Sequence, residues 1–288
     1  MKATRIAATA LTALAVAVIG AAPASAVLDP TGRVTVANDW SGDGRPDIAA
    51  LTTSGALYVY TNAGGSRFTA RPDLVATGLR GFVWARIAGD VDDDGKVDIL
   101  ARTAAGMLWL FRGDGAGDLA LVTPVSAGWS VFEEIVPIDL YGTGQVDLLA
   151  LDRETNTLRV YNGNPGTSWR IGVTIPLGSQ RWDHLTAFGD GDHDGYAELL
   201  VRDTATGRLI ALELRPSGTF QHSSQHRVIG VGFGAFTALT AVGDFDGTGN
   251  PDVIVRAPDG RLIAYAGYGD GRLAKPYTIG TRWGSLIL

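Results

Sequence analysis

The chain has 288 residues and no cysteine, and its 30 acidic and 24 basic side chains give a net charge of −6. An acidic chain lacks the basic surface that binds nucleic acid, so we expect no nucleic-acid partner. Without disulfides, stability must come from core burial and from any bound metal.

Residues 1–26 have the three parts of a secretory signal peptide. Lys2 and Arg5 supply the charged start, residues 7–20 form an apolar run, and residues 24–26 (Ala-Ser-Ala) form a small-residue cleavage site. The apolar run, about 14 residues, is too short to span a bilayer. We therefore expect a secreted, extracellular protein that is cleaved after Ala26 and does not insert into a membrane, with residues 27–288 as one domain. An uncleaved anchor is the alternative.

The mature sequence repeats with a period of about 50 residues, which is typical of stacked or radial repeat proteins. Five Asp-rich, mostly Gly-containing loops mark the copies, and they are spaced 51, 49, 51 and 54 residues apart. The first acids of these loops are Asp39, Asp90, Asp139, Asp190 and Asp244.

Each copy is predicted to hold four short strands and no amphipathic helix. A first strand leads into the loop, at residues 33–37, 85–88, 134–137, 184–188 and 238–242. An apolar second strand follows it, at residues 48–51, 99–101, 148–151, 199–201 and 253–255. After a polar turn comes an alternating third strand, at residues 56–60, 107–111, 157–161, 208–212 and 261–265. A Gly- or Pro-rich turn then precedes a weaker fourth strand, which predicts an all-β propeller with five four-stranded blades.

The end of the chain begins a sixth copy and stops. Residues 282–286 (Arg-Trp-Gly-Ser-Leu) repeat the pattern of residues 181–185 (Arg-Trp-Asp-His-Leu). We expect the last residues to pair near the first blade and close the ring. A calcium-type β-solenoid is the alternative fold, but its repeat is far shorter than about 50 residues.

The loop at residues 90–98 has acids at its first, third, fifth and ninth places and Gly95 at its sixth. This matches the first nine places of a calcium loop. Ca²⁺ takes six to eight oxygens, and carboxylates two residues apart converge only if the backbone turns tightly, which glycine permits. The backbone carbonyl of Lys96 and the carboxylate of Asp98 would complete most of the shell. An apolar strand follows this loop, where an EF-hand would have a helix.

The repeated pattern Gly-Asp-φ-Asp-x-Asp-Gly-x-x-Asp-φ-φ, where φ is apolar, resembles the FG-GAP or VCBS-type repeats of integrin α-chain propellers and of many bacterial secreted proteins. The resemblance covers all five copies. It implies a propeller with Ca²⁺ held in the hairpin between the first two strands of a blade. Such repeats occur in adhesion proteins, lectins and toxins, and as accessory modules on secreted hydrolases and lyases.

Carried over place by place, the pattern predicts two to four structural calcium sites, with a solvated Asp-Gly turn as the alternative for each loop. The two fullest ligand sets are Asp90, Asp92, Asp94, Lys96 and Asp98, and Asp190, Asp192, Asp194, Tyr196 and Glu198. Two further sets have three acids each: Asp39, Ser41, Asp43, Arg45 and Asp47, and Asp244, Asp246, Thr248, Asn250 and Asp252. The remaining loop, with Asp139, Tyr141, Thr143 and Asp147, has two acids, and we expect it to hold no metal.

An aromatic residue recurs before the first strand of a copy, and two roles are open for it. The rings could be equivalent sugar-stacking sites or wedges between blades, and large aromatics usually pack in a core. These residues are Trp84, Trp129, Trp182, Phe236 and Trp283.

No nucleophile elbow, His-rich metal motif, phosphate loop or Cys-His pair occurs in the sequence. Glu133 and Glu134 fall outside the repeat pattern, but adjacent residues of a strand face opposite ways and make a poor acid/base couple. We therefore expect a monomeric, non-enzymatic binding module whose partner is a carbohydrate or a cell-surface protein. The alternatives are a polysaccharide-active lyase or hydrolase, and a protein-binding scaffold or toxin subunit.

Overall fold

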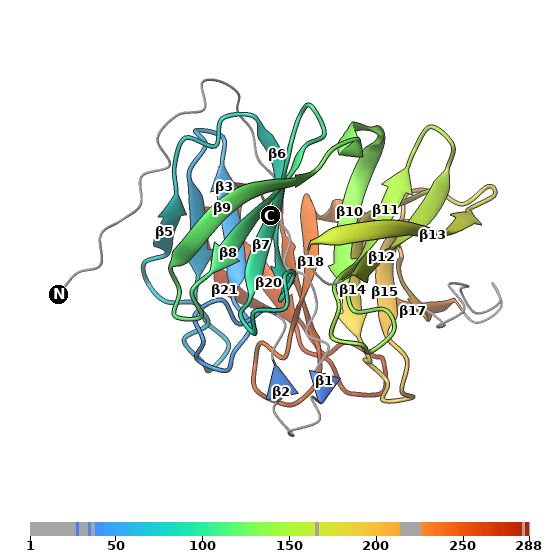
Figure 1. Cartoon of the computed structure of the whole chain (residues 1–288). Helices are drawn as coiled ribbons and strands as arrows, with labels where there is room; N and C mark the ends of the chain where they lie inside the picture. Colours follow the sequence, from blue (N-terminus) through green and yellow to red (C-terminus); the bar gives the residue numbers. More distant parts are fainter. Residues whose placement is uncertain are drawn as a thin grey trace.

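The computed structural model describes residues 27–28, 34–35, 38–164, 167–213, 226–283 and 286–287. The predicted signal peptide, residues 1–26, lies outside the described residues. Five four-stranded antiparallel sheets are arranged as the blades of a β-propeller (Figure 1). The prediction of an all-β propeller with five blades is confirmed.

The blades follow one another along the chain, and in blades 2 to 5 the spatial order of the strands is their order in the sequence. Blade 1 holds β22 (Leu286–Ile287), β3 (Ile48–Thr52), β4 (Leu57–Tyr60) and β5 (Asp73–Ala76). Blade 2 holds β6 (Phe82–Gly89), β7 (Asp98–Thr103), β8 (Leu108–Gly113) and β9 (Leu119–Ser126). Blade 3 holds β10 (Phe132–Ile138), β11 (Asp147–Asp152), β12 (Thr157–Asn164) and β13 (Ser168–Pro176). Blade 4 holds β14 (Trp182–Gly189), β15 (Glu198–Asp203), β16 (Leu209–Glu213) and β17 (Arg227–Gly230). Blade 5 holds β18 (Ala238–Gly243), β19 (Asp252–Arg256), β20 (Leu262–Tyr265) and β21 (Tyr277–Gly280).

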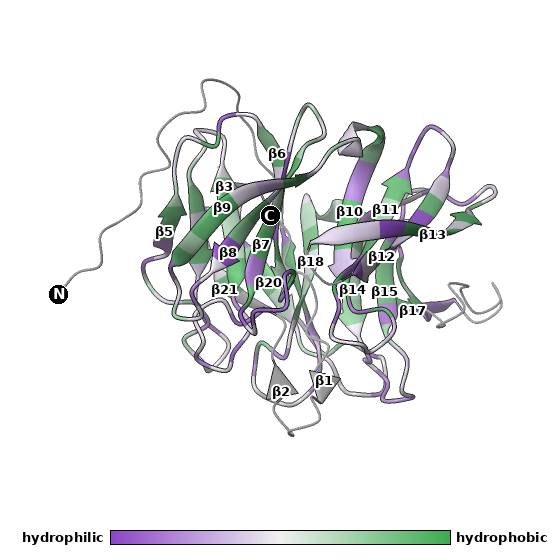
Figure 2. Ribbon diagram, viewed as in Figure 1, coloured by the Kyte–Doolittle hydropathy of each residue, from purple (hydrophilic) through white to green (hydrophobic). Residues whose placement is uncertain are grey.

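Burial falls from the inner strands to the outer ones. The first strands of neighbouring blades contact one another, as β10 does with β14 and β14 with β18. Each second strand carries an uninterrupted buried apolar run, because blades pack against both of its faces. Third strands such as β4 and β20 alternate between buried and half-buried residues, and most of β13 is exposed. Hydrophobic residues accordingly concentrate in the strands and hydrophilic ones in the connections (Figure 2).

The end of the chain closes the ring. β22 pairs antiparallel with β3, with Leu286 opposite Thr52 and Ile287 opposite Leu51. The expectation that the last residues pair with the first blade is confirmed, and this pairing covers a strand edge that would otherwise be open.

The prediction that residues 33–37 form the first strand of a blade is wrong. β2 (Val34–Thr35) pairs instead with β1 (Val27–Leu28) in a separate two-stranded sheet. The physical reason is that β22 already occupies the edge of β3 that this segment would have used.

Helical structure in the described residues is confined to short 3₁₀ turns such as η1 (Trp129–Val131) and η3 (Phe233–Ala235). Each follows a glycine in the left-handed region, Gly128 at φ 94° and Gly232 at φ 78°, a conformation that glycine adopts without strain. Each turn buries the aromatic residue that begins it. Within the described part of the chain, no helix has the length and apolarity needed to cross a membrane.

Candidate metal centres

We call the five acidic loops loop 1 (residues 39–47), loop 2 (90–98), loop 3 (139–147), loop 4 (190–198) and loop 5 (244–252). Loops 2 to 5 each connect the first strand of a blade to the second, and loop 1 leads into β3, the second strand of blade 1. Because strands alternate in direction within a blade, all connections from a first to a second strand lie on the same face of the propeller. This is where the resemblance placed the calcium sites.

The first acid of each loop organises the backbone of that loop. Asp90 accepts hydrogen bonds from the N–H groups of Asp94 (3.1 Å) and Gly95 (2.7 Å), the fifth and sixth residues. Asp139 in loop 3 accepts the same two bonds, from Thr143 (2.9 Å) and Gly144 (2.8 Å). Loop 3 therefore has this backbone turn although it lacks the third and fifth acids, so the turn forms independently of a full ligand set.

The ninth acid of each loop is buried and joins the loop to its own blade. Asp98 accepts hydrogen bonds from the N–H groups of Val91 and Gly113, both at 3.0 Å, and has no exposed surface. Burial raises the pKa of Asp98 to about 7, although the two hydrogen bonds oppose the rise. Burial likewise raises the pKa of the equivalent acids, to about 6 for Asp47, about 6 for Asp147, about 8 for Glu198 and about 7 for Asp252. A cation beside these acids would stabilise their charged form.

Three of the loops bring three carboxylates together. In each of these groups, one oxygen from every acid lies within 4.8 Å of the others. The groups are Asp90, Asp92 and Asp94 in loop 2, Asp190, Asp192 and Asp194 in loop 4, and Asp244, Asp246 and Asp252 in loop 5.

Loops 1 and 3 do not form such a group within the described residues. In loop 1 the predicted ligand Ser41 lies beside the first acid, with its hydroxyl 3.4 Å from Oδ1 of Asp39. Asp43 of that loop pairs with the neighbouring Arg45 on the surface, at 3.2 Å. Loop 1 is therefore less organised for a cation than loops 2, 4 and 5.

Loops 2 and 4 each contain a buried carboxylate oxygen without a hydrogen-bond donor. The Asp92 side chain is 6% exposed and the Asp192 side chain is 30% exposed. In each residue Oδ1 is itself buried and has no hydrogen-bond partner. A buried polar atom without a partner is unfavourable by about 1–3 kcal/mol. An oxygen-seeking cation would satisfy it, so the residues of these loops fit Ca²⁺.

The seventh residue of a loop was predicted to supply a backbone carbonyl. In loops 1, 2 and 4 its N–H donates to the fifth acid, with Arg45, Lys96 and Tyr196 each at 3.0 Å. In loop 5 the equivalent residue is Asn250, whose side-chain amide lies close to Gly269 of the adjacent turn. The role of these carbonyls as ligands stays a prediction.

Two arginines at loops 2 and 4 were missed by the sequence analysis. Arg112 of β8 contacts Asp92, and Arg227 of β17 contacts Asp192 and Glu198. They are separated from the loop acids by 14 or more residues, and neither belongs to the repeated pattern. No local sequence signal identifies them.

The aromatic residues do not occupy five equivalent places, which corrects the sequence-based alignment. Trp129 and Trp283 are equivalent. The backbone N–H of each donates to a carbonyl, of Gly106 and of Gly260, in the turn between the second and third strands of the preceding blade. Leu79 and Leu177 make the same hydrogen bond in other blades. Trp84 and Trp182 lie within first strands, and Phe236 follows η3.

The burial of these aromatics favours packing over ligand binding. Trp84, Trp129, Trp182 and Trp283 are 2–8% exposed, and all four belong to hydrophobic clusters between strands. Phe236 is half-buried against the cluster that contains Phe233. A sugar ring stacks on an open aromatic face, and the four indoles do not offer one in this structure.

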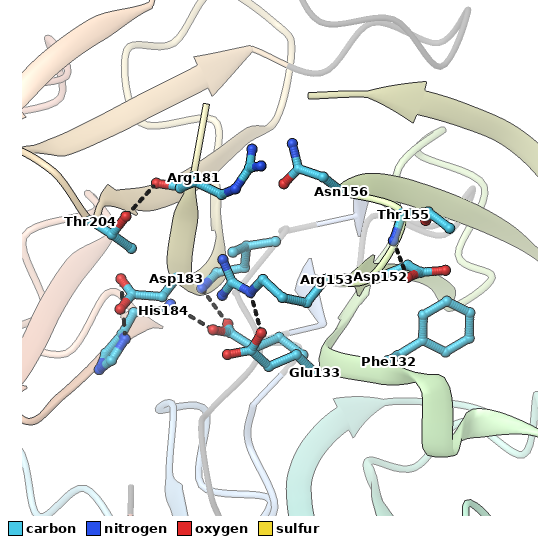
Figure 3. Close-up of polar contacts among 12 residues, drawn as sticks. Phe132, Glu133, Asp152, Arg153, Thr155, Asn156, Arg181, Asp183, His184 and Thr204 are labelled. Atoms are coloured by element: carbon cyan, nitrogen blue, oxygen red, sulfur yellow. Dashed lines mark hydrogen bonds and ion pairs between the residues drawn. The ribbon is translucent and has the colours of Figure 1, made fainter. Parts of the chain in front are cut away.

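The two glutamates outside the repeat pattern face opposite ways, as their adjacent places on a strand require. Glu133 pairs with Arg153 near the surface (Figure 3). Glu134 is half-buried and accepts hydrogen bonds from the backbone N–H groups of His184 (2.7 Å) and Leu185 (2.6 Å) in the next blade.

Arg86 of blade 2 completes this central contact. It is buried, and its guanidinium donates to the carbonyl of Leu185 at 3.2 Å. Burial lowers the pKa of Arg86 to about 10 and raises the pKa of Glu134, while the opposite charge of each opposes the shift of the other. His184 has φ 52°, and β14 has a bulge between Asp183 and Thr186, so the charged pair holds an irregular segment of backbone in place.

The comparison with protein families identifies the same repeats that the sequence analysis found. The FG-GAP-like repeat model matches residues 39–101, 139–201 and 190–255. No curated protein matches this sequence.

Among solved structures, the fold resembles AofleA from Arthrobotrys oligospora, with 12% identity, a TM-score of 0.50, and coverage of 88% of this chain and 76% of that one. The lectin BP39L from Burkholderia pseudomallei has 20% identity and a TM-score of 0.49, with 84% and 68% covered. A lectin from Agrocybe aegerita that recognises non-reducing terminal N-acetylglucosamine has 18% identity and a TM-score of 0.45. That alignment covers 85% of this chain but 66% of the lectin's own length. The 12% identity with AofleA shows the fold alone. The family match covers more than half of the chain, and the protein therefore belongs to the FG-GAP-like repeat family.

Proposed function

We propose that this protein is a secreted, monomeric, calcium-stabilised propeller that acts as a non-enzymatic binding module. The observation that carries the calcium part is the pairing, in loops 2 and 4, of a three-carboxylate cluster with a buried carboxylate oxygen that has no donor. When bound, Ca²⁺ would neutralise the clustered negative charge and satisfy that oxygen. Secretion rests on the sequence of residues 1–26 alone.

The acids of each loop have separate tasks in this proposal. The first acid turns the loop backbone, and the ninth joins the loop to its blade. In loops 2 and 4 the third and fifth acids, such as Asp92 and Asp94, are left to take the cation with the first. In loop 5 the cluster joins the first and third acids to the ninth, Asp252. A calcium ion would therefore stabilise the contact between a loop and its blade, and it would not need to take part in a reaction.

Glu134, the candidate catalytic acid of a polysaccharide-active enzyme, is already hydrogen-bonded to the backbone. Its two oxygens accept backbone hydrogen bonds in the next blade, and the side chain is half-buried. A general acid has to hold and release a proton at its substrate, whereas both oxygens of this carboxylate accept backbone hydrogen bonds. This favours a binding module over an enzyme whose catalytic acid is Glu134.

Thermal unfolding in calcium and in EGTA tests the calcium part. At about 1 mM Ca²⁺ and a Kd near 0.1 mM, each site adds on the order of 1.4 kcal/mol to the free energy of unfolding. Three sites would together raise Tm by roughly 8–16 °C in a domain of this size. We expect Asp94→Ala and Asp194→Ala each to remove part of the shift, and Thr143→Ala, at the same place in loop 3, to leave it unchanged. No difference between calcium and EGTA would refute the calcium part.

A carbohydrate or a cell-surface protein is the ligand class that we propose for the module. The test is an array of immobilised glycans, probed with the labelled mature chain in calcium and in EGTA. Calcium-dependent binding to one class of glycan would support a lectin-like module. A chain that remains folded in calcium and binds no glycan would point to a protein ligand instead.

A further inference from the structure

Loops 2 and 4 each have an arginine seated on their acid cluster. At loop 2, Nε of Arg112 contacts Oδ2 of Asp92, and one of its Nη atoms lies 4.0 Å from Oδ2 of Asp94. Both acids belong to the group whose oxygens lie within 4.8 Å of one another. The guanidinium therefore occupies part of the space in which a cation would bind.

At loop 4 the arginine comes from a different strand of its blade. An Nη atom of Arg227, on β17, lies 3.1 Å from Oδ2 of Asp192 and 2.9 Å from Oε1 of Glu198. The other Nη donates to the carbonyl of Asp270 in blade 5, at 2.8 Å. Gly271 makes room for it, because a Cβ there would overlap the guanidinium. Two unrelated strands thus bring the same chemical group to equivalent loops.

The electrostatics explain why an arginine lies there. Carboxylates held a few ångströms apart repel one another, and a guanidinium that contacts two of them offsets the repulsion. A divalent cation would do the same with two charges at a shorter distance, and it would repel the guanidinium. The two groups therefore compete for the same carboxylates.

We propose that Arg112 and Arg227 are internal counter-ions that occupy the clusters of loops 2 and 4 without calcium and move into solvent when calcium binds. This inference rests on the proposed calcium function. The Arg112 and Arg227 side chains are 34% and 32% exposed, so each can rotate outward without opening the core. Calcium would thereby add two mobile positive charges to the face of the propeller that carries the loops.

Loop 5 supplies a control within the same molecule. Its acids Asp244, Asp246 and Asp252 form a cluster of the same size, yet in the described residues none of them forms an ion pair with an arginine or lysine. Calcium meets no internal competitor there. The three loops are therefore expected to fall into two classes, with loop 5 filling at a lower calcium concentration than loops 2 and 4.

The experiment measures calcium affinity one loop at a time, by isothermal titration calorimetry. In a background that carries Asp192→Asn and Asp246→Asn, loop 2 is the remaining cluster, and Arg112→Gln is added to it. We expect its calcium affinity to rise about fivefold or more, the scale of a modest coupling between two binding events. The control is Arg261→Gln, which makes the same charge change in an exposed pair with Asp259 at the opposite end of a blade, and should have no effect.

Unchanged or weaker affinity after Arg112→Gln would overturn the inference, since it would mean that the arginine orients Asp92 instead of competing with the cation. Thermal unfolding adds a second readout: Arg112→Gln should lower Tm in EGTA but not in calcium, whereas a merely structural arginine would lower both. If that variant does not fold, Arg227→Gln with loop 4 as the remaining cluster gives the same test. Should the parent chain bind no calcium at any of the three clusters, the proposed function itself fails. If the chain binds calcium and neither arginine variant changes affinity, the counter-ion inference alone fails.

Discussion

Replacing Glu134 by alanine should destabilise the propeller strongly, because Glu134 and Arg86 together join three blades at Leu185. The substitution leaves the N–H groups of His184 and Leu185 without their acceptor and leaves the buried guanidinium of Arg86 without its opposite charge. Breaking a buried pair by removing one partner costs about 3–5 kcal/mol. An ordinary domain is stable by roughly 5–15 kcal/mol, so this loss is a large share of the total. In a domain of this size it corresponds to a fall in Tm of roughly 6–20 °C.

The assay is urea unfolding of the mature chain, followed by tryptophan fluorescence at pH 7. The matched control is Glu133→Ala on the same strand, which removes a surface pair with Arg153 and should cost no more than about 1 kcal/mol. Glu134→Gln keeps the size and one acceptor oxygen, so its loss should lie between the two. If Glu134→Ala unfolds at the same urea concentration as Glu133→Ala, the argument that this pair joins the blades is refuted.

Three further predictions follow from the packing and charge of the described residues. Burial raises the pKa of Asp183, but hydrogen bonds from His184 and Arg202 outweigh it and hold the pKa below its usual value. The stability this gives is present above about pH 4, the pKa in the unfolded chain, and is lost as the pH falls toward the folded pKa, so the deficit of Asp183→Asn in urea unfolding should shrink between pH 7 and pH 3. A deficit that does not change with pH would contradict this. Trp182→Ala opens a cavity at a side chain that is 2% exposed and should lower the unfolding free energy by about 3–5 kcal/mol in the same assay, whereas a ligand platform would lose binding at unchanged stability. A chain that ends at Trp283 lacks β22, so blade 1 loses its inner strand. Its melting temperature, followed by circular dichroism, should be lower than that of any single-loop variant. An unchanged melting temperature would show that pairing of β22 with β3 is not needed for stability.

The blades were predictable because their signals are local and repeated. Each second strand is an apolar run that directly follows an Asp-rich loop, so strand and loop can be aligned five times in one sequence. The carboxylate clusters of loops 2 and 4 follow from residues two apart around a tight turn, as expected. Closure by the tail was also predictable, since residues 282–286 repeat an earlier segment.

What could not be predicted depends on contacts between distant residues. Arg112 and Arg227 reach loops 2 and 4 from a third and a fourth strand, and which strand carries the arginine differs between the blades. Glu134 and Arg86 both bond to Leu185 because two first strands approach the same bulge in a third. The alignment of the aromatic residues was wrong because the equivalent place in a blade is defined by a backbone hydrogen bond. Leu79 and Leu177 make the same backbone hydrogen bond as Trp129, so an aromatic side chain does not identify this place.

The most direct test of the central claim is the number of calcium ions that the mature chain binds. Equilibrium dialysis against about 1 mM calcium, with the metal measured by mass spectrometry, would give this number at the affinity expected of an extracellular module. We predict three ions per chain, falling to one when Asp92→Asn and Asp192→Asn remove the acids of loops 2 and 4 that have an unpartnered buried oxygen. A folded chain that binds no calcium would show that the acidic loops are hydrogen-bonded turns, and the calcium account would be wrong.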